Sequence, residues 1–314
     1  MVKVVVAGGQ YVGSRNQAAW SQQKEAEVVG MADSVAALRE LLKEKEVDVV
    51  DIGPTLESPE EWIVPAAEAK KHVICDFGGQ IGVEAIREVA TLCENQGVQL
   101  LLANALRFSP EYEQAREHVQ QGAIGKPGVI RMRRSGPAPA LGAGKPCIFN
   151  DLGAEEFDWL HWTFGNVVRV MARRVTHTDE FGQQMEYALV ILRHEDGTIA
   201  HVELSWAEED ERAAFELTGD LGMIWHDSSE SQPIVLQMSK QQEQADSGAE
   251  RFTDVADADR WRRSREHFLR SLSGQEPLRL SLEDVIYARE IVQAARQSAE
   301  TGQPVQLVDG GNSR

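Results

Sequence analysis

Short, mostly apolar runs recur through the first hundred residues and alternate with amphipathic segments. The runs are rich in β-branched residues, as strands are when both faces of a sheet are covered; they span residues 2–7, 28–32, 47–52, 72–75 and 98–103. The segments between them include two with helical spacing, residues 34–45 and 83–96. Strand and helix repeating at this interval predict βαβ units and a doubly wound parallel sheet.

From about Arg107 the pattern changes to long alternating segments, which are typical of an antiparallel sheet with one face in water. Alternate residues of the segment 199–206 are apolar, and Asp196-Gly197 before it predicts a hairpin with the strand at 187–192. A capping Ser281 and a terminating Gly302 predict a last helix at about 281–301 that packs back on this domain.

These patterns predict an α/β protein of two domains. Residues 1–106 would form a Rossmann-type nucleotide-binding domain with a doubly wound parallel sheet. Residues 107–314 would form a substrate and oligomerisation domain with an open, largely antiparallel sheet. The length of 314 residues agrees with this division, because a single hydrophobic core seldom grows beyond about 250–300 residues.

Composition narrows the possible partners and the compartment. The chain has 50 acidic and 32 basic side chains, and a net charge of -18 repels nucleic acid and anionic membrane surfaces. Its three cysteines show no disulfide or metal-ligand spacing, which favours a reducing compartment. No apolar run approaches the roughly 18 residues of a membrane span. We therefore expect a cytoplasmic protein that binds a small-molecule substrate or ligand.

A glycine-rich turn follows the first predicted strand and opens a helix. Its sequence runs Gly8-Gly9-Gln10-Tyr11-Val12-Gly13, and Asp33 lies twenty residues further on, at the end of the second strand. In a dinucleotide fold the glycines admit the pyrophosphate and the acidic residue binds the adenosine ribose. Gln10 departs from this pattern, because it occupies the position of the middle glycine. The alternative is an ordinary strand-to-helix turn with a helix-capping Asp33.

Carboxylates gather in the segment 150–162. On a continuous helix Asp151, Glu155, Asp158 and Trp162 would share one face. Neighbouring carboxylates in a shielded cleft raise at least one pKa, which suits a general acid or base. The alternative is a solvated acidic helix start, where the helix dipole favours negative charge.

Several longer motifs resemble those of the Gfo/Idh/MocA oxidoreductases, in the same order and over nearly the whole chain. They lie at residues 107–112, 122–127, 151–165, 186–206, 219–224 and 298–305. The resemblance implies a Rossmann domain, a second α/β domain that often supports dimers or tetramers, and NAD(P)-linked oxidation or reduction of sugars and polyols. It also implies roles for individual residues. Cofactor contacts are expected from Gly8, Gln10, Gly13, Asp33, Asp76 and Phe77, and substrate contacts from Arg107, Asp158 and Trp162.

Two catalytic positions depart from the family pattern. Phe77 stands where the resemblance places a lysine, and Glu155 stands where it places the acid/base histidine, whereas Asp151 is retained. A phenyl ring carries neither charge nor a proton, and positioned proton transfer is typically worth about 10²- to 10⁴-fold in rate. Family chemistry would then require Glu155 to take the proton and another cation to replace the lysine. Lys145 is the nearest candidate in the sequence.

Three hypotheses about function follow. The first is an oxidoreductase with an atypical active site, with Asp151 and Glu155 as catalytic residues and a nicotinamide cofactor, NAD in preference to NADP because of Asp33. The second is a non-catalytic member that senses a ligand or acts as a scaffold. The third is a non-redox lyase or hydrolase that uses the same carboxylates, either directly or to hold a divalent cation. A homodimer or homotetramer is expected in each case.

Overall fold

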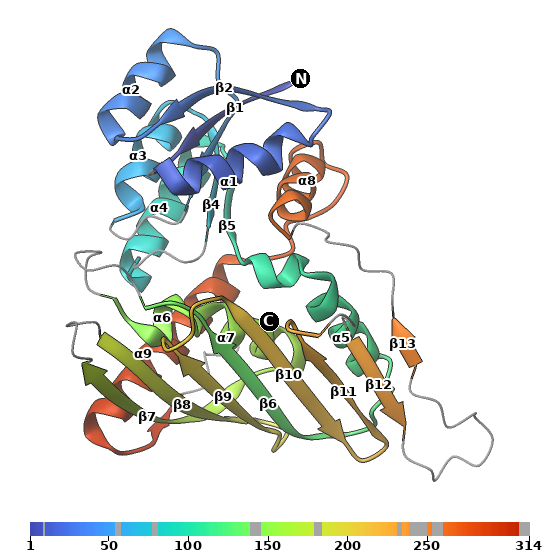
Figure 1. The fold of residues 1–314 in the computed structure, drawn as a ribbon. Helices are drawn as coiled ribbons and strands as arrows, with labels where there is room; N and C mark the ends of the chain where they lie inside the picture. Colours follow the sequence, from blue (N-terminus) through green and yellow to red (C-terminus); the bar gives the residue numbers. More distant parts are fainter. Residues whose placement is uncertain are drawn as a thin grey trace. The chain divides into compact units, whose positions relative to one another are not determined.

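The computed structural model describes residues 1–8, 10–53, 58–76, 81–138, 146–178, 184–230, 234–238, 250–252 and 260–307. The chain forms two compact units (Figure 1). Unit 1 comprises Met1–Ser109 and Ala258–Ile286, and unit 2 comprises Pro110–Asp257 and Tyr287–Arg314. The sequence-based division after residue 106 assigned everything beyond it to the second domain. In the structure a segment near the C-terminus instead completes the first unit.

Unit 1 is built on a parallel sheet of five strands in the order β2-β1-β3-β4-β5. The strands are β1 Val2–Ala7, β2 Ala26–Ala32, β3 Val49–Ile52, β4 His72–Asp76 and β5 Leu100–Ala103. Every residue of β3 is buried, because helices cover both faces of the sheet. The doubly wound parallel sheet predicted from the apolar runs is confirmed.

The helices of unit 1 lie on opposite faces of this sheet. They are α1 Gln10–Ser21, α2 Val35–Glu44, α3 Glu60–Glu68, α4 Val83–Gln96, the 3-10 helix η1 Ala105–Phe108, and α8 Arg260–Leu272. Right-handed crossovers place α1 on one face and α2 to α4 on the other, and α8 packs beside α1 and η1. The late segment therefore covers a part of the sheet that the first hundred residues leave open.

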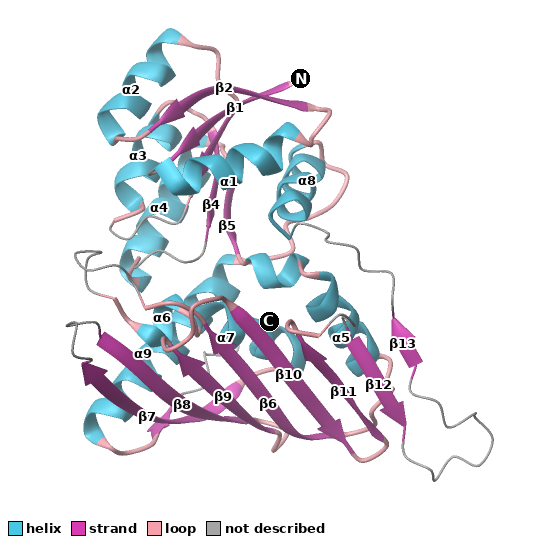
Figure 2. Ribbon diagram, in the orientation of Figure 1, coloured by secondary structure: helices cyan, strands magenta, loops and turns pink. Residues whose placement is uncertain are grey.

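Unit 2 contains a sheet of nine strands in the order β13-β12-β11-β10-β6-β9-β8-β7-β14 (Figure 2). The strands are β6 Pro127–Ser135, β7 Val167–Thr178, β8 Gln184–His194, β9 Ile199–Ser205, β10 Arg212–Gly219, β11 Gly222–Asp227, β12 Ile234–Met238, β13 Glu250–Phe252 and β14 Val305–Gln306. Only β6 and β9 pair in parallel; the other pairings are antiparallel. This confirms the predicted open, largely antiparallel sheet.

Helices cover one face of the second sheet. They are α5 Pro110–Gln120, α6 Ile148–Asp151, α7 Ala154–Phe164 and most of α9, Leu282–Thr301, whose first turn belongs to unit 1. The start of α9 is capped where the sequence indicates, because the Ser281 hydroxyl accepts from the backbone N–H of Asp284 at 3.1 Å. The other face of the sheet carries exposed apolar side chains, Val175, Tyr187, Leu189 and Ile199.

Candidate functional site

The chain passes from β1 into α1 at Gly8. Gly8 follows the last residue of β1 and has a φ of 139°, a backbone conformation that favours glycine. Its N–H donates to the Ala32 carbonyl at the end of β2, at 3.0 Å. The helix begins at Gln10, and Gly13 lies in its first turn. A helix N-terminus therefore opens directly beyond the strand, as anion binding requires.

Asp33 lies beside this turn. It directly follows β2, and the last residues of β1 and β2, Ala7 and Ala32, are paired in register. Its side chain is exposed, so its carboxylate is accessible as an acceptor for ribose hydroxyls. Together the glycine conformation and the adjacent exposed carboxylate fit the adenosine and pyrophosphate end of a dinucleotide.

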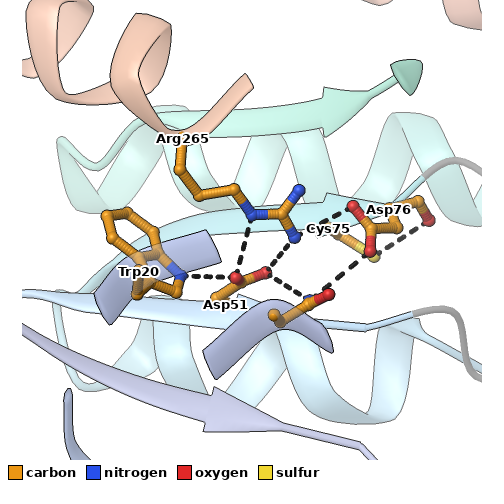
Figure 3. A network of polar contacts seen from close by, with 6 residues as sticks. Trp20, Asp51, Cys75, Asp76 and Arg265 are labelled. Atoms are coloured by element: carbon orange, nitrogen blue, oxygen red, sulfur yellow. Dashed lines mark hydrogen bonds and ion pairs between the residues drawn. The ribbon is translucent and has the colours of Figure 1, made fainter. Parts of the chain in front are cut away.

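Asp76 belongs to a buried polar network, which we call the Arg265 cluster: Asn16, Trp20, Asp51, Asp76 and Arg265 (Figure 3). The guanidinium of Arg265 donates to both oxygens of Asp51, at 3.1 and 2.9 Å, and to Asp76 at 3.1 Å. The Asn16 amide donates to Asp51 at 3.1 Å and to Asp76 at 3.4 Å. The Trp20 indole donates to Asp51 at 2.5 Å. Both carboxylates are thus engaged inside the protein.

The charges of the Arg265 cluster act on one another in a dry environment. Burial raises the pKa of Asp51, and the positive charge of Arg265 opposes that rise. Burial also disfavours the charged form of Arg265, but Asp51 and Asp76 outweigh this effect and raise its pKa. The Nη1 atom of Arg265 is buried without a hydrogen-bond partner in the part of the chain that the structure describes. The cofactor contact predicted for Asp76 stays a prediction, since its side chain is turned inward.

Sequence reasoning missed Asp51 and Arg265. A signal for Asp51 was present, because it is a carboxylate within the otherwise apolar β3. Arg265 offered a weaker one, an arginine between buried positions of an arginine-rich helix. Neither signal indicates that Asp51 and Arg265 contact each other. Phe77 and Lys145 lie outside the described residues, so the roles considered for them remain sequence-based predictions.

Unit 2 corrects the expectation of one continuous acidic helix. The chain turns at Leu152 and Gly153, so that Asp151 ends α6 whereas Glu155 lies in the first turn of α7, which begins at Ala154. A Cβ atom on Gly153 would lie 2.6 Å from the Phe149 carbonyl oxygen, and only glycine permits this close approach. The expectation of one continuous helix is therefore corrected, whereas the shared face of Asp151 and Glu155 stays a prediction.

Asp151 is partly buried and held by two donors. The backbone N–H of Cys147 donates to one carboxylate oxygen at 2.9 Å, and the Asn150 amide donates to the other at 2.9 Å. Burial raises the pKa of Asp151, against these hydrogen bonds and the charge of Arg289. A raised carboxyl pKa is what proton transfer near neutral pH requires, so the environment suits a general acid or base.

The remaining predicted residues of α7 have different surroundings. Glu155 is half-buried and, after Glu156 and Tyr112, is among the groups that raise the pKa of Arg134 against the effect of burial. Asp158 is completely buried. Trp162 is half-buried beneath the guanidinium of Arg116, which lies 3.8 Å from the ring centroid.

Arg107 lies in the interior of unit 1. Its side chain is fully buried in η1 and donates to the Arg279 carbonyl at 2.9 Å and to the Asp284 carboxylate at 3.3 Å. Burial opposes ionisation of Asp284, but Arg107 and Ser281 lower its pKa overall. These contacts hold the segment before α9 against η1, and the substrate contact predicted for Arg107 stays a prediction.

A parallel dinucleotide-type sheet and an open sheet with one helix-covered face together define a two-unit α/β protein with a Rossmann-type first unit. Comparison with known proteins agrees. Residues 112–225 match the family model of the GFO/IDH/MocA C-terminal domain. Myo-inositol 2-dehydrogenase of Thermotoga maritima is 25% identical over 304 residues, which cover 90% of this chain and 86% of that protein. Together these two matches support membership of the Gfo/Idh/MocA family.

Solved structures show the same fold at lower identity. An Agrobacterium radiobacter oxidoreductase in complex with NAD⁺, L-tartaric acid and magnesium superposes with a TM-score of 0.78 at 20% identity, covering 97% of this chain and 98% of the other. A biliverdin reductase from Synechocystis, in complex with biliverdin and NADP⁺, has a TM-score of 0.78 at 18% identity, covering 95% and 99%. Likeness at this identity shows the fold.

Two absences hold for the described part of the chain. None of its helices combines the length and the apolar character needed to cross a membrane. Among the same residues, no group of three or more histidine, cysteine, aspartate or glutamate side chains is arranged to hold a metal ion.

Proposed function

We propose that this protein is a nicotinamide-dependent oxidoreductase that acts on a sugar, a polyol or a related small molecule through an atypical active site. The observation that carries the proposal is the turn at Gly8 with the exposed carboxylate of Asp33 beside it, because this pair suits a dinucleotide. The substrate class rests on the similarity to a myo-inositol 2-dehydrogenase over most of both chains.

In this proposal unit 1 binds the cofactor and unit 2 handles the proton. The nicotinamide, when bound, supplies hydride transfer. Gly8 leaves room for the pyrophosphate, and Asp33 accepts hydrogen bonds from the ribose and disfavours a 2′-phosphate, so NAD is preferred over NADP. Asp151 takes the proton of the substrate hydroxyl, because its partly buried carboxylate is kept in one orientation by two donors. Glu155 assists as a second carboxylate.

A self-associated state is the second part of the proposal. The uncovered face of the nine-stranded sheet exposes Val175, Tyr187, Leu189 and Ile199. Apolar side chains gathered on an open sheet face favour contact with another surface. We infer a homodimer or homotetramer that uses this face.

Cofactor titration tests the enzymatic proposal. NAD and NADP are added while the fluorescence of the seven tryptophans is followed, and turnover is then measured on a panel of polyols and sugars. We expect NAD to bind more tightly than NADP. Asp33→Asn should weaken NAD binding by about tenfold, because an uncharged amide is a poorer acceptor for two ribose hydroxyls.

The matched control is Glu44→Gln, which removes an exposed carboxylate from α2 and should leave both affinities unchanged. Absence of binding by either nucleotide at millimolar concentration would refute the proposal. Binding without turnover on any substrate of the panel would favour the non-catalytic alternative, in which the family scaffold serves as a ligand sensor.

A further inference from the structure

Helix α9 brings an arginine next to Asp151, inside unit 2. Arg289 is buried, with 4% of its surface exposed. Its Nη1 donates to the side-chain oxygen of Asn150, which is itself buried, and the Asn150 amide nitrogen donates to Asp151 at 2.9 Å. A continuous chain of polar contacts therefore links the guanidinium to the carboxylate.

This chain has a direction that follows from the donor inventory. A guanidinium only donates, so Arg289 must face the oxygen of the Asn150 amide and not its nitrogen. The NH₂ group of Asn150 is consequently turned toward Asp151, and it can only donate to the carboxylate. With the Cys147 N–H on the other oxygen, at 2.9 Å, the plane of the Asp151 carboxylate is defined. Arg289 thus determines that the NH₂ group of Asn150, and not its oxygen, contacts Asp151.

Arg289 also acts on Asp151 through its charge. Burial favours the neutral form of Asp151 and raises its pKa, while the positive charge of Arg289 works in the opposite direction. The other arginine to consider on α9, Arg296, acts on the Cys147 thiol, whose pKa burial raises. On α7, the charge of Glu155 acts on Arg134.

Strands β8 and β9 pack against α6 and also carry ionisable side chains, but among the described side chains none of these is paired with Asp151. On the helix-covered face of β8, Glu186 lies 3.5 Å from Arg174. His194, on the same face, contacts the Gly165 carbonyl at 3.0 Å, and burial lowers its pKa. The ionisable residues of β9 alternate with the buried positions and lie on the opposite face of the sheet; they are His201 and Glu203. Within the part of the chain that the structure describes, Arg289 is therefore the charged side chain that acts on Asp151.

We propose that Arg289 is a positioning residue for Asp151: through Asn150 it orients the carboxylate, and its charge keeps that carboxylate available as a base. The inference rests on the proposed function, because it assumes that Asp151 handles the proton. It gives the site a buried cation that comes from α9, while the role considered for Lys145 stays a sequence-based prediction. A purely structural role for Arg289 would stabilise α9 without affecting the pH at which turnover is lost.

The test compares Arg289→Met, which keeps length and removes charge and donors, with Arg296→Met as the matched control on the same helix. The ionisation of Asp151 is followed by ¹³C NMR of labelled aspartate carboxyls in the full-length protein, and Asp151→Asn assigns the signal. In parallel, kcat/KM with NAD and the best substrate of the panel is measured across pH.

Arg289→Met should move the titration of Asp151 to higher pH and shift the acid limb of kcat/KM in the same direction. The sign follows because the base must be ionised, and without the neighbouring positive charge its proton is lost at higher pH. Above that limb kcat/KM should remain about 10²-fold lower, since the carboxylate is no longer oriented. Arg296→Met should leave both profiles where they are in the unsubstituted protein.

An unchanged Asp151 titration in Arg289→Met overturns the inference, and so does a shifted titration that the kcat/KM profile does not follow. If Arg289→Met fails to fold, Arg289→Lys decides. Its ammonium keeps the positive charge but cannot reproduce the fixed guanidinium fork, so the titration of Asp151 should stay in place while kcat/KM above the acid limb falls, and an unchanged kcat/KM refutes the inference. Loss of the proposed function is recognised separately: cofactor binding and turnover are then absent from the unsubstituted protein, whereas the NMR titration still reports on Arg289.

Discussion

Single residues decide whether unit 1 is suitable for the proposed nucleotide. Gly8 adopts a φ of 139° at the end of β1, and Asp33 presents an exposed carboxylate at the end of β2. The two strand ends are neighbours, because the Gly8 N–H donates to the Ala32 carbonyl. Residues of this kind can be read from the chain, because the turn needs glycine and the carboxylate needs only a place at a strand end.

Gly8→Ala tests the glycine. An L side chain is strained at this φ, so we expect a loss of about 1–3 kcal/mol in the free energy of unfolding and weaker NAD binding. Gly82→Ala is the control, because Gly82 has a φ of -75° and open space around its Cβ position. Denaturant unfolding and fluorescence titration measure the two effects. Equal behaviour of the two variants would contradict the importance assigned to the Gly8 conformation.

At the scale of elements, α8 is held on the sheet of unit 1 by the Arg265 cluster. The guanidinium lies between carboxylates from two adjacent strands, Asp51 of β3 and Asp76 of β4. Burying these charges is unfavourable unless they remain paired. The cluster therefore fixes α8 against β3 and β4. In return, Arg265 of α8 neutralises the buried carboxylates of these two strands.

Arg265→Met should lower the free energy of unfolding by about 3–5 kcal/mol, because it leaves two buried carboxylates without their cation. Adding Asp51→Asn to this variant should recover part of the loss, since one uncompensated charge is then removed. Arg270→Met is the control on the same helix, where the side chain is about half exposed; its ion pairs should contribute no more than about 1 kcal/mol. Denaturant unfolding measures all three. A similar loss for Arg265→Met and Arg270→Met would show that the buried pairs do not hold α8.

At the scale of the whole molecule, the free face of the nine-stranded sheet bears on self-association. Leu189 lies on β8 opposite Glu203 of β9 and is 40% exposed. Leu221, in the turn before β11, is exposed to nearly the same extent, 37%, but lies away from the middle of that face. The two leucines therefore form a matched pair for a test of the interface.

Leu189→Glu should shift the mass in solution toward the monomer, because a second carboxylate beside Glu203 would have to be buried on association. Leu221→Glu should leave the mass unchanged. Light scattering coupled to size-exclusion chromatography gives both masses. A monomeric unsubstituted protein, or the same mass for both variants, would rule out this face as the interface.

The sequence was sufficient for the class of fold and for the strands of the first sheet. Buried parallel strands are recognised as continuous apolar runs. Strands of a sheet with one solvent-exposed face are recognised by alternating apolar and polar residues. Both patterns are local, because they depend only on which side chains are exposed to water. The glycine turn and Asp33 were found in the same way. The helix break at Gly153 was not, because it depends on the approach of Phe149 and Phe157, which no periodicity records.

Long-range partners were decided only by the tertiary structure. Arg265 is 214 residues from Asp51 along the chain, and Arg289 is 139 residues from Asn150. Little in the sequence around Arg265 or Arg289 indicates burial, and arginine side chains usually lie on the protein surface. Folding buries both of them, and a buried guanidinium must find carboxylate or amide oxygens wherever the chain supplies them. Residue types and their periodicity therefore determined the framework, whereas the identity of the buried cations became visible only once distant segments were packed together.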